Sequence, residues 1–257
     1  MLLRRITKHV TEQNWFAVIL DLLIVVFGVF IGMQVTNWNA DNAGEKQATI
    51  LLNRIYNDLQ NDILSINAEL EYQAVVRNYA VTAVKALNNK DAVSFEQFVI
   101  GAYQASQINP AWSYRATYNE MLSTGQINLI ENETLKALIF GYFSSDFATT
   151  QYLLKIAPYR EYIRGKMPMY LQDEIKDQCN DITIKVANTF GAKLPSTCSL
   201  DISEEALNQA AEFLHSQPDM LFHLQFQIAV NDTKVSNLQN YAAESKSLMK
   251  AIKAYQE

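Results

Sequence analysis

The chain has 257 residues, of which 49% are hydrophobic and 19% charged, and its formal net charge is -6 at pH 7. This acidic balance argues against nucleic acid and against an anionic lipid surface as partners. Because the chain has only 8 glycines and 5 prolines, its composition favours a well-formed hydrophobic core over a disordered linker.

The first element in the chain is an apolar run over residues 16–35, FAVILDLLIVVFGVFIGMQV. At about 1.5 Å per residue, a helix of this length spans about 30 Å, the thickness of a bilayer's hydrocarbon core. Trp15 and Trp38 bracket the run, where an aromatic belt is expected. Since no A-x-A-like cleavage site follows, the sequence predicts an uncleaved transmembrane helix over 15–38 rather than a signal peptide.

The flanking charges predict the direction of insertion. Arg4, Arg5 and Lys8 lie in the N-terminal tail, residues 1–14. Basic residues collect on the cytoplasmic side of a membrane helix. We therefore expect a cytoplasmic N-terminus, a single crossing and an exported domain over residues 39–257.

One face of the expected span carries an acid and two glycines. At about 100° per residue, Gly28 and Gly32 lie within about 20° of Asp21, and Val25 and Val35 share that face. An intramembrane acid usually faces protein, and a GxxxG spacing lets a second helix approach closely. We expect this face to dock on an integral membrane protein or on a second copy. The alternative is that Asp21 reaches the cytoplasmic interface and the glycines are incidental.

A long, stalk-like helix is predicted after the span, from Glu45 to Leu87. Apolar residues recur in it at spacings of three and four. They include Ile55, Leu59, Ile63, Ile66 and Leu70. This helix is expected to continue the membrane helix, with a bend near Gly44.

Shorter helices follow. Ser94, with Gln97 three residues on, predicts a capping box at the start of a short helix. Pro110 is expected to open the next helix, and Gly125 suits the left-handed position that ends it. Residues 126–130 then read as a brief extended piece.

The C-terminal half gives the same helical signals. Asn132 is placed as the N-cap of a helix that reaches Ile156. Asp201 with Glu204 predicts a second capping box, and Pro218 begins the last helix. Because strand signals are scarce, the sequence predicts an all-α fold, in which a single transmembrane helix is followed by a periplasmic helical bundle.

The two cysteines, Cys179 and Cys198, both fall in the exported part. In an oxidising compartment such a pair forms a disulfide, and this one would close a loop worth about 3 kcal/mol. Two buried free thiols are the alternative. A metal site is disfavoured, because two cysteines without nearby histidines do not provide four ligands.

Two stretches resemble a bacterial family of uncharacterised single-pass membrane proteins. The first, DLLIVVFGVFIGMQVTNWN, has an early acid, a middle rich in small residues, and Gln and Asn-Trp at the outer edge. These features fall on Asp21, Gly28, Gly32, Gln34, Asn37 and Trp38. The second, TYNEMLSTGQINLIENETLKALIFGYF, is similar to the family's turn followed by an apolar pair and a polar helix start. It covers Leu122, Ser123, Gly125, Ile127, Leu129, Ile130 and Asn132. The resemblance supports the topology and implies no activity.

Catalytic and cofactor motifs are missing from the sequence. His9, His215 and His223 form no i, i+4 metal pair, and H-E-x-x-H is absent. The glycines form no phosphate-binding loop, and no G-x-S-x-G elbow occurs. The sequence therefore predicts no metal, no cofactor and no enzymatic activity.

One aromatic cluster invites a functional interpretation. Trp112, Tyr114, Arg115 and Tyr118 are residue types that favour partner surfaces and ligand pockets. The alternative, that they belong to the core of the bundle, is the more common outcome for such residues.

The sequence as a whole is interpreted as a non-enzymatic inner-membrane protein. Its expected role is that of an accessory, scaffolding or sensing subunit that docks to a membrane partner through its span. The runner-up is an ion-coupled, stator-like subunit in which Asp21 titrates, since a short basic tail, one span with an acid and an exported domain also fit that layout.

Overall fold

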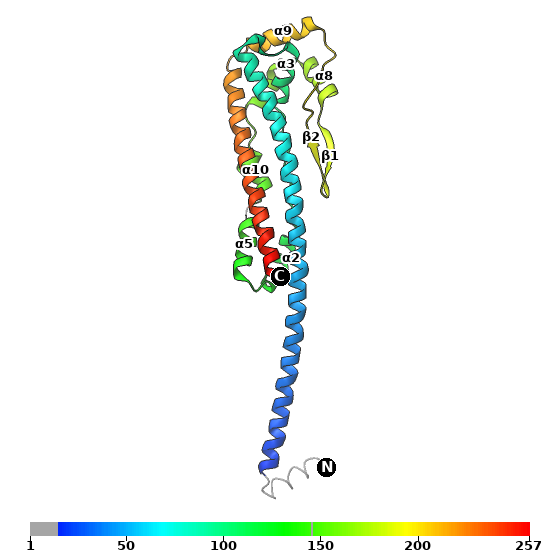
Figure 1. Ribbon diagram of the computed structural model, residues 1–257, viewed down its shortest axis with the longest axis vertical. Coiled ribbons are helices and arrows are strands. Elements are labelled where there is room, and N and C mark those ends of the chain that lie inside the picture. The colour runs from blue at the N-terminus through cyan, green and yellow to red at the C-terminus, as the bar shows by residue number, and fades with distance from the viewer. Residues whose placement is uncertain (1–14, 145) are drawn as a thin grey trace.

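The computed structural model describes residues 15–144 and 146–257 and is mostly helical (Figure 1). Its dominant element is α2 (Trp15–Asn88), a single helix of 74 residues, whose length is about 110 Å at about 1.5 Å per residue. The first part of α2 projects alone from the other described elements, and its second part carries a helical domain. The expected span and the expected stalk are therefore one helix, which is uninterrupted at Gly44.

The projecting part of α2 is apolar and exposed. Within the described residues, α2 is the one helix long and apolar enough to cross a membrane, and its most apolar window is not buried by the rest of the protein. An exposed apolar stretch of this length is typical of a membrane-spanning helix.

The domain is organised around the pairing of α2 with the last helix, α10 (Met220–Gln256), which runs back along it (Figure 1). Side chains from both helices fill a lower core near the projecting segment. This core is formed by Leu51, Leu52, Ile55, Leu59, Leu248 and Ile252, with residues of α4 (Ala116–Ser123) and α5 (Glu133–Ser144). The C-terminus therefore ends beside the lower end of the domain.

A second core lies at the far end of α2. It is built by residues of α2 and α10 together with α3 (Phe95–Gln104), α7 (Tyr159–Lys166), α8 (Met169–Cys179) and α9 (Glu204–His215). The short η1 (Lys90–Ala92) lies between α2 and α3 and has no buried residue. The predicted capping box of α3 is confirmed, since Ser94 and Gln97 exchange two hydrogen bonds of 3.1 Å. The predicted cap of α9 is wrong by two residues, because the hydroxyl of Ser203, not a group of Asp201, accepts from the first turn.

The lower end contains shorter elements than the sequence predicts. They are α4 (Ala116–Ser123), η2 (Gln126–Leu129), α5 (Glu133–Ser144), η3 (Phe147–Thr149) and α6 (Gln151–Leu154). Gly125 has φ +72° and Asn132 accepts from the Leu135 N–H, as expected for these two signals. Two predictions are wrong: η2 replaces the extended piece, and no helix starts at Pro110.

The all-α prediction holds except for one hairpin. β1 (Ile182–Val186) pairs antiparallel with β2 (Thr189–Lys193), with Ile184 opposite Gly191. A Cβ at Gly191 would lie 2.9 Å from Val186 Cγ2, so a larger residue there would require the Val186 side chain to shift. Between the strands, Ala187 adopts a left-handed φ of 50°, as tight hairpin turns require.

The hairpin is held at its base by the predicted disulfide. Cys179 at the end of α8 is joined to Cys198, with their Cα atoms 5.6 Å apart. We expect replacement of both cysteines by serine to lower the free energy of unfolding by about 3 kcal/mol. Chemical denaturation of the oxidised protein and of the double variant measures this difference. An unchanged midpoint, or peptides from non-reducing digestion in which the two cysteines are not linked, would contradict the assignment.

Candidate functional site

The face predicted for docking is open along the projecting segment. Asp21, Val25, Gly28, Gly32 and Val35 are all exposed. A Cβ built on Gly28 or on Gly32 meets nothing within 4 Å. The helix therefore presents a flat strip of backbone beside one carboxyl group, with room for another helix to approach.

The residues expected at the membrane interfaces lie at the two ends of the apolar segment. Trp15 and Trp38 are 65% and 66% exposed, in positions where their rings can sit at lipid headgroups. Arg4, Arg5 and Lys8 lie outside the described residues.

Inside the domain, the buried face of α2 follows an unbroken spacing of four and three residues. Its central line is Ala48, Leu52, Ile55, Leu59, Asp62, Ile66, Glu69, Gln73, Val76, Ala80 and Ala83, and Leu51, Ser65, Tyr72 and Ala86 are buried beside it. This is the heptad pattern of a helix packed along a partner helix. Three polar residues therefore occupy core positions in the middle of the domain, and the sequence prediction had assigned the neighbouring Ile63 and Leu70 to that face instead.

Asp62 is the centre of the first buried polar group. One carboxylate oxygen accepts from the Tyr114 N–H at 2.7 Å, and the other accepts from the Tyr142 hydroxyl at 2.8 Å. Tyr142 Oη also lies 2.7 Å from Ser245 Oγ on α10. Burial raises the pKa of Asp62 to about 7, although both hydrogen bonds act to lower it.

Glu69 is the centre of the second group. Its carboxylate accepts from the side-chain amides of Gln73 and Asn109, each at 2.7 Å. Burial raises the pKa of Glu69 to about 7, and these two hydrogen bonds and the positive charge of Lys234 act in the opposite direction. Asn231 of α10 donates to Gln73 Oε1 at 2.6 Å, which extends the group across to that helix.

The two groups hold an extended segment against α2. We call residues 109–115, between α3 and α4, the strap. Its Asn109 side chain donates to Glu69, its Trp112 N–H to Ser65 at 3.0 Å, and its Tyr114 N–H to Asp62. Because these donors are satisfied by α2 side chains, this part of the chain does not need the helical hydrogen bonds that Pro110 suggested.

The aromatic cluster predicted as a partner surface is divided by the fold. Trp112 is half-exposed on the strap, whereas Tyr118 is buried and stacks on Phe143 with ring centroids 4.8 Å apart. Arg115 donates to the Phe143 carbonyl and lies 5.9 Å from the centre of the Tyr118 ring. Tyr118 therefore has the core role, and Trp112 remains available to a partner.

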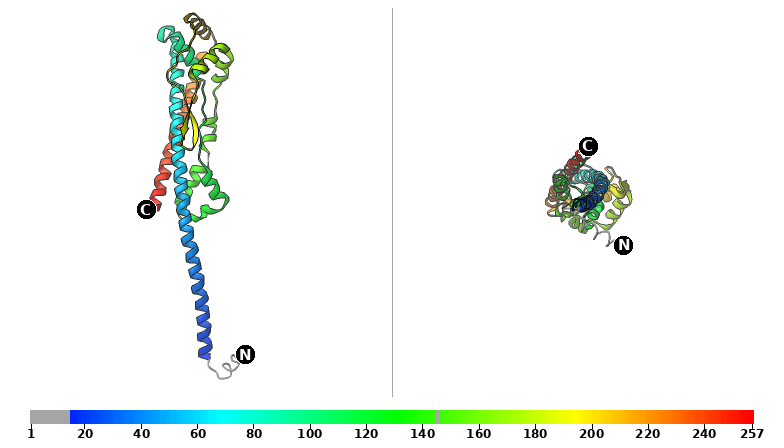
Figure 2. Two further views of the ribbon diagram at one scale, coloured as in Figure 1. Left: turned by 90° about the vertical axis from the view of Figure 1, so that its right-hand side faces the viewer. Right: turned by 90° about the horizontal axis from the view of Figure 1, so that it is seen from below.

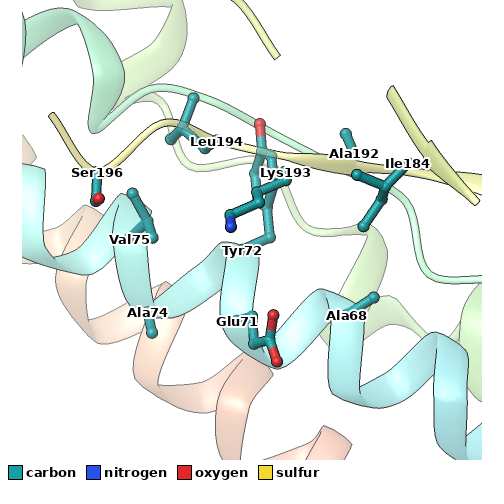
Figure 3. Close-up of a pocket in the computed structure, with 10 residues that line it drawn as sticks. All are labelled: Ala68, Glu71, Tyr72, Ala74, Val75, Ile184, Ala192, Lys193, Leu194 and Ser196. Atoms are coloured by element: carbon teal, nitrogen blue, oxygen red, sulfur yellow. The ribbon is translucent and has the colours of Figure 1, made fainter. Parts of the chain in front are cut away.

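A cavity lies between α2 and the hairpin, away from Asp62 and Glu69 (Figure 3). It measures about 270 Å³, and apolar side chains such as Val75, Ile184 and Leu194 form most of its wall. Figure 3 shows Tyr72 rising from α2 toward the hairpin, where its hydroxyl donates to Asp181 at 3.0 Å. The cavity offers an apolar surface, with Glu71 and Lys193 as its charged lining residues.

The hydrogen-bonded groups around Asp62 and Glu69 can stabilise the fold, and their carboxyl groups can gain or lose a proton. Among residues 15–144 and 146–257, no cluster of three His, Cys, Asp or Glu side chains could hold a metal ion. Asp62 and Glu69 have pKa values near neutrality, yet their oxygens are engaged by the strap, Tyr142 and Gln73. The sequence analysis did not predict that Asp62 and Glu69 are buried. Their position in the four-three spacing of the apolar residues of α2 is the sequence signal that could have indicated it.

Comparisons with known proteins identify a family but no activity. A search of curated proteins and a search of solved structures each found no match. A family model matches residues 21–154, from Asp21 to the end of α6. This range includes both stretches on which the resemblance to an uncharacterised family rests, together with the strap and the two buried acids. The match covers just over half of the chain, which therefore belongs to a family of unknown function (DUF6090).

Proposed function

We propose that this protein is a non-enzymatic accessory subunit of a bacterial inner membrane, with a scaffolding or sensing role. It crosses the membrane once, with its N-terminus in the cytoplasm and its domain in the periplasm. The observation that carries the proposal is the continuity of α2, which runs as one helix from the exposed apolar segment into both cores of the domain. A movement or a docking event at the span is thereby passed to the domain without a flexible joint.

Two features support the orientation. The basic residues Arg4, Arg5 and Lys8 precede the apolar segment, as is typical of a cytoplasmic flank. The Cys179–Cys198 pair lies at disulfide separation in the domain, as expected in an oxidising compartment.

The docking role is supported by the open face of the span. A carboxyl group in hydrocarbon is costly unless protein covers it, and the described residues leave Asp21 exposed. Gly28 and Gly32 on the same face allow the close approach that such cover requires. The partner is therefore an integral membrane protein or a second copy of the chain.

The sensing role is supported by the buried acids. Asp62 and Glu69 both have pKa values of about 7 because of burial, so their charge changes near neutral pH. Both hold the strap, which carries the half-exposed Trp112. A change in periplasmic pH would alter how firmly this segment is held.

A stator-like function is the second candidate, favoured by the place of Asp21 on the open face of the apolar segment. The two functions differ in what they require of the carboxyl group. A docking contact needs a hydrogen-bonding group, which an amide of similar shape provides. An ion-coupled role needs a group that gains and loses a proton, which an amide cannot do.

We expect Asp21→Asn to preserve both membrane assembly and cell phenotype, and Asp21→Leu to weaken assembly by leaving a polar group of the partner unpaired. Co-isolation from native membranes in mild detergent and growth of the host measure the two effects, with the exposed Asp41→Asn as a control. If Asp21→Asn assembles normally but reproduces the deletion phenotype, the stator-like function replaces the accessory one.

A further inference from the structure

A second exposed stripe on α2 continues the docking face of the span into the domain. It consists of Ile50, Asn53, Asn57, Gln60, Leu64 and Asn67, spaced by three and four residues, all of them exposed. Ile50 and Leu64 are 53% and 50% exposed, although both are large apolar side chains. At about 100° per residue, Ile50, Asn57 and Leu64 lie within about 20° of the direction of Asp21. The stripe and the span face are therefore one line along a single helix.

Beside the stripe, the helices of the domain pack on the opposite side of α2, whereas the hairpin lies over the continuation of the line, at Ala68 and Val75. Ile55, Leu59 and Ile66, which are fully buried, point about 160° to 200° away from Asp21. The apolar segment projects below the domain with no described element beside it (Figure 1). The end-on and side views show the domain gathered around the far part of α2 (Figure 2). Another helix can therefore lie along the line from Gly28 to Leu64 while the bulk of the domain faces away.

The stripe is uncharged. Every exposed residue of α2 from Thr49 to Asn67 is apolar or carries a hydroxyl or an amide, in a protein whose formal net charge is -6. Charged side chains of this stretch, such as Arg54 and Asp58, lie on its flanks and are partly buried. The stripe from Ile50 to Asn67 is therefore free of charged residues. Between the span and the stripe the line carries one exposed charged residue, Lys46, about 20° from the direction of Asp21.

We infer that the occupant of this line is a second copy of the chain, which packs α2 against α2 in parallel along the span face and again along the uncharged stripe from Ile50 to Leu64. The inference rests on the proposed docking role of the span. Two copies inserted in one membrane have the same direction, and a two-fold axis places each residue opposite itself. Like charges would repel there, whereas an amide both donates and accepts and so pairs with its own copy. Asn53, Asn57 and Gln60 meet this condition, and Ile50 and Leu64 add apolar contacts.

Cysteine cross-linking of the full-length protein in native membranes tests the inference. We expect Asn57→Cys to give a covalent dimer upon mild oxidation. The matched control is Asn208→Cys, an exposed asparagine of α9 away from the stripe, which should remain monomeric. The native cysteines do not interfere, because they are joined to each other.

A charge variant gives an independent measurement. Asn57 is exposed, so the Asn57→Asp variant should fold normally, as judged by circular dichroism. Like-charge repulsion should raise its dimer dissociation constant in mild detergent by at least about tenfold. Equal cross-linking at positions 57 and 208, with a monomeric wild-type protein, would overturn the inference. If the protein is monomeric but retains another membrane protein, and loses it upon substitution of Gly28, the second-copy inference fails and the docking role stands. If it is monomeric and retains no membrane protein, both the inference and the docking role are wrong.

Discussion

Replacement of Asp62 by asparagine is expected to stabilise the domain at alkaline pH and to leave its stability in acid almost unchanged. The folded protein holds the pKa of Asp62 at about 7, while the unfolded chain has an ordinary value of about 3.9. Between these two values the folded state binds more protons than the unfolded state. The contribution of Asp62 to the free energy of unfolding therefore falls as pH rises from about 4 to about 7, and is constant above that.

The side-chain amide of the Asp62→Asn variant does not ionise, so it removes the free-energy cost of ionising a buried carboxyl group. It can still make the hydrogen bonds that Asp62 makes. Its oxygen can accept from the Tyr114 N–H, and its nitrogen can donate to Tyr142, whose hydroxyl then donates to Ser245. A pKa shift of about three units corresponds to an upper value of about 4 kcal/mol, so we expect a gain of about 2 to 4 kcal/mol at pH 8. Chemical denaturation between pH 4 and pH 8 measures it in the full-length protein in mild detergent.

Two further variants complete this experiment. Asp62→Leu should lower stability by about 2 to 3 kcal/mol at pH 4, because it leaves the Tyr114 N–H and the Tyr142 hydroxyl without their acceptor. Since leucine, like asparagine, does not ionise, this deficit relative to the wild type should shrink as pH rises toward 8. Asp177→Asn, on the exposed side of α8, is the control and should be silent. Since Glu69 also titrates near pH 7, the difference between variant and wild type isolates Asp62. A difference that does not vary with pH would show that this carboxyl is ionised throughout.

The second large effect is expected at the glycines of the span. Gly28→Ile or Gly32→Ile would place a branched side chain where nothing now lies within 4 Å, and would keep a second helix from approaching closely. We expect about tenfold less assembly, equivalent to about 1.4 kcal/mol. The amount of dimer or partner retained after solubilisation in mild detergent is the measurement.

Met33→Leu is the matched control for the glycine variants. Met33 points about 120° away from Asp21, and the change nearly conserves volume, so assembly should be unaffected. Equal losses from all three substitutions would mean that the docking face has been assigned to the wrong side of the helix.

The course of α2 could be predicted from the sequence, because apolar spacing is a local signal. The apolar segment, the stalk that follows it and the caps at Ser94 and Asn132 follow from neighbours within a few residues. The burial of Asp62 and Glu69 could not be read in this way, since an acid in a helical sequence is usually exposed. Most of the partners that make their burial possible belong to the strap and Tyr142, both distant in the chain, and Gln73 is a local donor.

The errors at Pro110 and in the hairpin have the same cause. Proline suits a helix start, but the donors of the strap are satisfied by α2, which local sequence does not reveal. Residues 182–186 are rich in β-branched side chains, and an isolated two-stranded hairpin is only marginally stable. Here the hairpin packs on α2 around Val75 and Val76 and is closed by the disulfide.

We propose that α2 carries the chain across a membrane and holds the domain on the far side. A pair of reporters fused after Glu257, one active only in the periplasm and one only in the cytoplasm, tests it most directly. We expect the periplasmic reporter to be active and the cytoplasmic one to be silent, in cells where the protein sediments with the membranes. An active cytoplasmic reporter, or a protein that remains in the soluble fraction, would contradict it.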